Sequence, residues 1–171
     1  VIGKILFLIG LSSFWFGCNN GAKEVVKERT IFDREKHAGL SSIGYLLAKT
    51  TFLGAITSLQ ITMLLFLSSF LCSYSIGFFG LSYLPCLLLS GLSGIGFGIL
   101  ISSNTRSNEA ASTVVPLVII PQVILSGGLT PLGGWAQRVS MLLSPSYWTY
   151  GSLTGSLYRT EAVWSSWEKT E

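Results

Sequence analysis

A charged stretch between two apolar runs constrains the fold more than any other feature of this chain. Residues 19–40 have the sequence N-N-G-A-K-E-V-V-K-E-R-T-I-F-D-R-E-K-H-A-G-L. Residues 1–18 carry one charged side chain, Lys4, and residues 43–132 carry only Lys49, Arg106 and Glu109. A run of about 20 apolar residues spans the hydrocarbon core of a bilayer. The apolar runs are therefore expected to cross a membrane, and the charged stretch to lie in the water beside it.

The composition predicts an all-α membrane protein. Hydrophobic residues make up 49% of the chain and charged residues 11%, whereas soluble domains have ~25% charged residues. Since helices satisfy their own backbone hydrogen bonds in lipid, we predict a polytopic transmembrane helix bundle. Its membrane helices are expected at 43–73, 83–103 and 110–127, residues 1–18 form the end of another, and residues 74–82 form a short outer turn. Pro116 and Pro121 should kink the helix at 110–127.

Residues 20–38 are predicted to form an amphipathic helix on the cytoplasmic surface. Asn19 or Asn20 is expected to cap its N-terminus. Lys and Arg residues gather in and beside this segment, and the positive-inside rule therefore predicts that it is cytoplasmic. Residues 130–158 then lie on the outer side, as re-entrant or surface helices. Their aromatic residues suit the membrane interface.

Small and polar residues inside the predicted spans suggest where helices touch. Gly54 and Ser58 in one span, and Ser90, Gly94 and Gly98 in the next, recur every four residues. Small side chains at this spacing let helix backbones approach closely in lipid. Gln60 is the only amide side chain within 43–73, so it either lines a functional path or forms a hydrogen bond between helices.

Several classes of function are disfavoured. The net charge of +3 is too small to indicate nucleic-acid binding. No G-x-x-x-x-G-K-[ST] loop for ATP, no C-x-x-C pair and no span with an acid–base pair occurs in the sequence. We therefore expect no catalytic residue, metal or cofactor in this chain.

Two separated motifs resemble one known family. The first is K-E-x-x-x-F-D-R-E-x-x-x-G-L from Lys27, and the second is L-S-G-G-L-T-P-L from Leu125, followed by S-P-S-Y from Ser144. Together they resemble the membrane domain of type-2 ABC exporters, most closely the G (White-like) subfamily and its bacterial relatives. The resemblance covers nearly the whole chain but only the middle of the family's domain, so the chain is expected to be a fragment that lacks the first and sixth membrane helices.

The resemblance implies an export path at a dimer interface, formed with a second permease copy or paralogue. ATP and Mg would bind to an ABC nucleotide-binding domain, fused or separate, outside this chain. The charged helix would couple to that domain through five residues: Glu28, Arg29, Asp33, Arg34 and Glu35. Ser126, Gly128 and Leu129, together with Gln60, would form the translocation path or its outer gate, with Leu129 as a single-leucine constriction.

The leading hypothesis is a permease that moves a lipid-like, amphipathic or apolar substrate out of the cytoplasm or inner leaflet. Such a protein would be a multi-pass component of a bacterial plasma membrane. The alternative is a membrane scaffold or sensor whose cytoplasmic helix binds a regulatory partner without transport.

Overall fold

The chain folds into seven helices over the residues that the computed structural model describes, 2–37, 41–72, 76–129 and 132–167. These are α1 (Ile2–Gly21), α2 (Glu24–His37), α3 (Ser42–Cys72), α4 (Ile76–Asn104), α5 (Asn108–Leu125), α6 (Gly134–Leu143) and α7 (Pro145–Trp167). Four segments are long and apolar enough to cross a membrane: Gly3–Glu28, Ser42–Phe70, Tyr83–Asn104 and Asn108–Leu125. The predicted all-α membrane bundle is thus confirmed.

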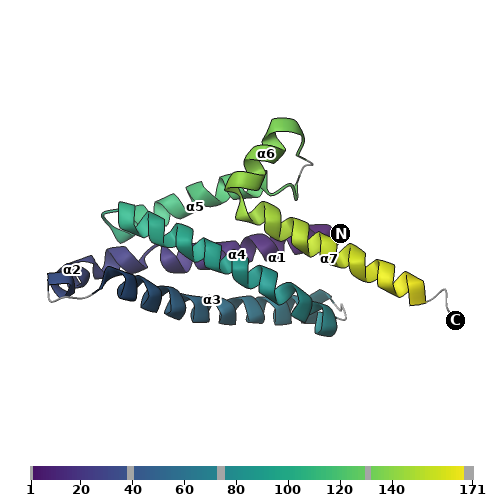
Figure 1. Ribbon diagram of the computed structural model, residues 1–171, viewed down its shortest axis with the longest axis horizontal. Helices are drawn as coiled ribbons and strands as arrows, with labels where there is room; N and C mark the ends of the chain where they lie inside the picture. The colour runs from purple at the N-terminus through teal and green to yellow at the C-terminus, as the bar shows by residue number, and fades with distance from the viewer. Residues whose placement is uncertain (1, 38–40, 73–75, 130–131, 168–171) are drawn as a thin grey trace.

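Helix α1 is the centre of the bundle. It packs most extensively against α4 and also contacts α3, α5 and α7. Figure 1 shows α2 at one end of the elongated molecule, next to the start of α3, whereas α7 extends toward the opposite end. The short helix α6 projects from the side of the bundle near the start of α7.

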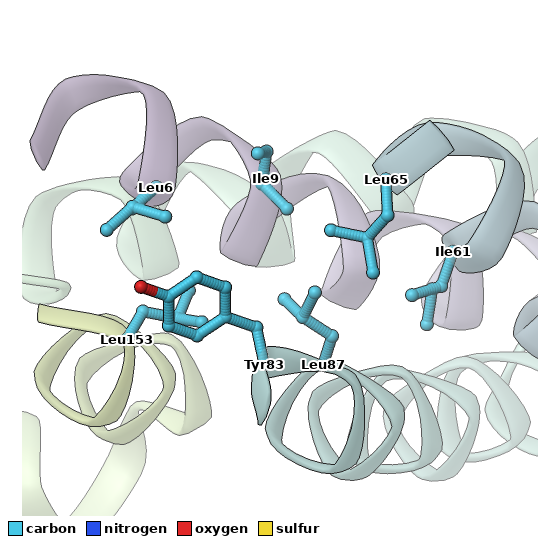
Figure 2. Close-up of a cluster of buried hydrophobic side chains, with 7 residues drawn as sticks. All are labelled: Leu6, Ile9, Ile61, Leu65, Tyr83, Leu87 and Leu153. Carbon is cyan, nitrogen blue, oxygen red and sulfur yellow. The ribbon is translucent and has the colours of Figure 1, made fainter. Parts of the chain in front are cut away.

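Two apolar clusters hold these helices together. In Figure 2, side chains from α1, α3, α4 and α7 meet in the first cluster: Leu6, Ile9, Ile61, Leu65, Tyr83, Leu87 and Leu153. The second joins α1, the residue that follows it, α4 and α5: Phe14, Cys18, Ala22, Ile101, Ala111, Val115 and Ile119. Since α1 contributes to both clusters, it links the two halves of the bundle.

Several helix boundaries differ from those expected. Helix α2, expected at 20–38, begins at Glu24. Helix α1 continues to Gly21, because Asn19 and Asn20 lie inside the helix rather than in a cap. Helix α4 begins at Ile76, so most of the expected turn at 74–82 is helical; its glycines are compatible with a helix in a membrane, where glycine is common. Helix α7 reaches Trp167, beyond the outer element expected at 130–158.

Candidate functional site

Lys49 of α3 forms ion pairs with two glutamates in the first two turns of α2. Its Nζ lies 2.7 Å from Oε1 of Glu24 and 2.6 Å from Oε1 of Glu28, and the three side chains are 20–30% exposed. Tyr45, one turn before Lys49, donates a hydrogen bond of 3.2 Å to Oε2 of Glu28. An isolated exposed ion pair contributes ~0.2–1 kcal/mol, but one cation shared by two carboxylates forms a small network.

The contact between α2 and α3 continues for one more turn. The rings of Phe32 and Tyr45 lie 4.7 Å apart between centroids. Glu24, Glu28 and Phe32 are spaced by four residues and therefore share one face of α2. The other described side chains of α2 include exposed Lys27, Ile31 and Arg34, so α2 is attached by one face and leaves another open to a partner.

The predicted coupling residues do not all face outward. The carboxylate of Glu28 forms an ion pair with Lys49 and accepts a hydrogen bond from Tyr45, both within this chain. Arg34 is exposed. The backbone of Arg29, Asp33 and Glu35 belongs to α2, but their side chains lie outside the described residues. Sequence reasoning did not link Lys49 to Glu24, although a cation within a long apolar segment generally has a partner.

The N-terminus of α2 is capped by a residue of α4. Ser102 Oγ accepts hydrogen bonds from the backbone N–H groups of Val25, at 3.0 Å, and Val26, at 2.9 Å. Ser102 is 1% exposed. The expectation that Asn19 or Asn20 caps this helix was therefore wrong, because both asparagines belong to α1.

Asn20 instead joins α1 to α3. Its Nδ2 donates to Thr57 Oγ1 at 3.0 Å and to Gln60 Oε1 at 2.7 Å. In membranes such interhelical hydrogen bonds contribute roughly 0.6–2 kcal/mol. Of the two roles considered for Gln60, the hydrogen bond between helices matches this geometry. Its place in a translocation path stays a prediction.

The small residues of α4 lie against α1 at backbone distance. A Cβ added to Gly98 would lie 2.5 Å from Cys18 O and 2.8 Å from Ala22 N. A Cβ on Gly94 would overlap Phe14 O. On α1, Gly21 lies against Gly98, and Gly17 lies against the backbone of Gly91 and Ile95. Sequence reasoning missed both glycines, although their G-x-x-x-G spacing favours such a contact.

The other small residues considered for packing have different surroundings. Ser90 is buried, and its Oγ lies 3.5 Å from Gly10 O on α1. The nearest neighbour of a Cβ on Gly54 would be a Leu92 side-chain atom at 3.6 Å, which is an ordinary contact. Gly54 and Ser58 line a groove of about 310 Å³ between α3 and α4, so they do not bring two backbones together here.

A polar junction connects α5 to the helices α6 and α7. Gln122 of α5 is 4% exposed; its Oε1 accepts a 2.9 Å hydrogen bond from Ser144 Oγ, and its Nε2 lies 3.4 Å from Leu143 O. Ser144 Oγ in turn accepts from the backbone N–H of Tyr147 at 3.2 Å. Gln122 is the only amide side chain in α5 after its first residue, Asn108, and sequence reasoning did not use this signal.

The predicted gate residues form a turn after α5. Ser126 Oγ accepts from the backbone N–H of Gly128 at 3.2 Å. A Cβ on Gly128 would lie 2.6 Å from Cγ of Phe7, so this position brings the turn against α1. Leu129 is 64% exposed. It does not fill a constriction among the described residues of this chain, and a gate would need a second chain.

The chain belongs to the family described as ABC-2 type transporter, which matches residues 2–158. Together with the four candidate spans among its described residues, this makes the chain a multi-pass membrane part of an ABC permease. It is 24% identical over 157 residues to the ABC transporter ATP-binding/permease protein Rv1747 of Mycobacterium tuberculosis (strain ATCC 25618 / H37Rv). That alignment covers 88% of this chain and 18% of the relative. No solved structure matches the chain significantly.

Proposed function

We propose that this permease is the membrane part of an ATP-driven exporter in which α2 receives the movement of an ABC nucleotide-binding domain. ATP and Mg bind to that domain, fused or separate, and hydrolysis takes place there. The supporting observation is the attachment of α2 to α3 by Lys49, through both Glu24 and Glu28. A helix that is fixed on one face can pass a movement of the nucleotide-binding domain, bound at its exposed face, on to α3. The similar M. tuberculosis protein is named as both ATP-binding and permease.

The proposed substrate is lipid-like, amphipathic or apolar, and it moves out of the cytoplasm or inner leaflet of a bacterial plasma membrane. Between residues 50 and 125, the only charged residues are Arg106 and Glu109, at and just after the turn between α4 and α5. Polar side chains such as Asn20 and Gln122 hydrogen-bond to other parts of the chain. A path formed by these spans would therefore hold few groups that could bind a charged solute.

A second permease copy, or a paralogue, is proposed to complete the path. Helix α5 exposes Leu117, Ile120 and Ile124, and Leu129 follows at its outer end. In this arrangement Leu129 and its counterpart form the outer constriction, because apolar side chains exclude water from a narrow pore. Ser126 and Gly128 shape the turn that presents Leu129.

The test of coupling replaces Lys49. Lys49→Met removes both ion pairs but keeps an unbranched side chain, and Lys4→Met, at the far end of α1, is the matched control. Both are produced with the nucleotide-binding domain and reconstituted in vesicles with a fluorescent phospholipid. We expect Lys49→Met to insert normally but to lose several-fold in lipid moved per ATP hydrolysed, while Lys4→Met matches the wild type.

Two results would count against the proposal. Wild-type transport per ATP in Lys49→Met would mean that the attachment of α2 plays no part in coupling. If the wild type moves no lipid and its ATP hydrolysis does not respond to lipid, the alternative of a scaffold or sensor with a docking helix would be favoured.

A further inference from the structure

The first turn of α2 lacks a cap of its own. The carbonyl of Lys23 accepts the backbone hydrogen bond of Lys27 at 3.1 Å, so Lys23 occupies the N-cap position. N-cap side chains such as Ser, Thr, Asp or Asn bond to the N–H groups two and three residues later. A lysine side chain has no acceptor atom. The two N–H groups concerned, those of Val25 and Val26, bond to Ser102 of α4 instead.

Near Ser102, α4 is packed closely against the end of α1. A movement of α4 at this point therefore requires a movement of α1 as well. Gly98 is one turn before it, and the backbone there is in contact with Cys18, Gly21 and Ala22. Ser102 and Ala22 are both almost fully buried. The Ser102 hydroxyl is therefore shielded from water, although the donors Val25 and Val26 are half-buried. The ion pairs of Lys49 are partly exposed and are weakened by salt.

The residues after Ser102 lead directly to α5. Helix α4 ends at Asn104, and Ser107 caps α5 by accepting a 3.1 Å hydrogen bond from the N–H of Ala110. A displacement of the α4 end must therefore reach α5 through a turn of only three residues, 105–107.

We propose that Ser102 is a positioning residue for coupling: its hydroxyl joins the N-terminus of α2 to α4, so that a movement of α2 is carried to the end of α4 and to α5. This inference rests on the proposed function of α2. It assigns the two attachments of α2 different roles, because Lys49 holds α2 to α3 while Ser102 links it to the helix that leads to α5.

The test uses hydrogen exchange of the full transporter, with its nucleotide-binding domain, in lipid nanodiscs with and without a non-hydrolysable ATP analogue. Ser102→Ala removes the hydroxyl. Ser103→Ala is the matched control, because the neighbouring hydroxyl bonds to Leu100 O within α4 itself. In the double variant Ser102→Ala with Lys23→Ser, α2 regains a cap from its own N-cap residue but not the link to α4.

In the wild type and in Ser103→Ala, the analogue should change exchange both in the first turn of α2 and in residues 101–105. Ser102→Ala should raise basal exchange at Val25 and Val26 about fivefold, the factor that corresponds to the ~1 kcal/mol of a typical cap. In Ser102→Ala, the analogue should still change hydrogen exchange in α2 but should no longer change it in residues 101–105. The double variant should restore basal protection in α2 without restoring the response in α4.

Three outcomes would overturn the inference. A normal response of residues 101–105 in Ser102→Ala would show that the hydroxyl does not transmit the movement. Recovery of that response in the double variant would show that Ser102 acts only by stabilising α2. If α2 of the wild type does not respond to the analogue at all, the proposed function itself fails and the inference with it.

Discussion

The backbone contact between α1 and α4 makes Gly98→Ala a strong test of the fold. To move from 2.5 Å to the 3.4 Å at which ordinary contacts begin, the new Cβ would have to gain about 0.9 Å from Cys18 O. The neighbouring atoms are backbone and cannot rotate away. A gap of 0.5–1 Å forfeits roughly a quarter to a half of the dispersion energy of each contact along the interface. Overpacking of this kind costs about 1–3 kcal/mol.

Gly96→Ala is the matched control on the same helix. A Cβ at Gly96 would have no neighbour within 4 Å, so this variant should be neutral or more stable by up to ~1 kcal/mol, because alanine favours helix. Both variants are purified in a mild detergent, and their unfolding free energy is measured by SDS titration. Equal stability of Gly98→Ala and Gly96→Ala would refute the close contact of α1 and α4.

Three further predictions concern the polar contacts and the orientation. Gln122→Leu should cost ~1–3 kcal/mol, because it leaves the buried Ser144 hydroxyl without its acceptor; limited proteolysis should then cleave the α6–α7 junction faster, and an unchanged rate would argue against this junction. Asn20→Leu should lower the unfolding free energy by roughly 0.6–2 kcal/mol, as expected for hydrogen bonds between membrane helices, and a variant as stable as the wild type would contradict that role. In whole cells, an impermeant thiol reagent should label a cysteine at Trp148 but not one at Arg34; the reverse pattern would invert the proposed orientation.

The sequence predicts the class of fold well because lipid leaves few alternatives. Apolar runs such as 43–73 must be helical if they cross a bilayer, and α3 occupies Ser42–Cys72. Helix ends are harder to predict, because glycine and asparagine, which end helices in water, are retained inside α1 and α4.

The candidate site was only partly predictable, since its bonds join distant segments. Lys49 could have been paired with Glu24 and Glu28, because it is a cation in an apolar run that needs carboxylates nearby. The role of Ser102 could not be foreseen in this way. Its spacing from Gly98 indicates packing equally well, and only the three-dimensional position of Val25 shows what its hydroxyl binds.

The two prolines within α5 have a consequence for the surface that this helix can face. Proline has no N–H, so Pro116 and Pro121 cannot donate to the carbonyls of Ser112 and Leu117, four residues earlier. Leu117 and both prolines are exposed. A backbone carbonyl without a donor costs several kcal/mol in hydrocarbon but little in contact with water or a polar partner. This side of α5 is therefore poorly suited to lipid tails, and a hydrated passage or a neighbouring subunit would satisfy it better.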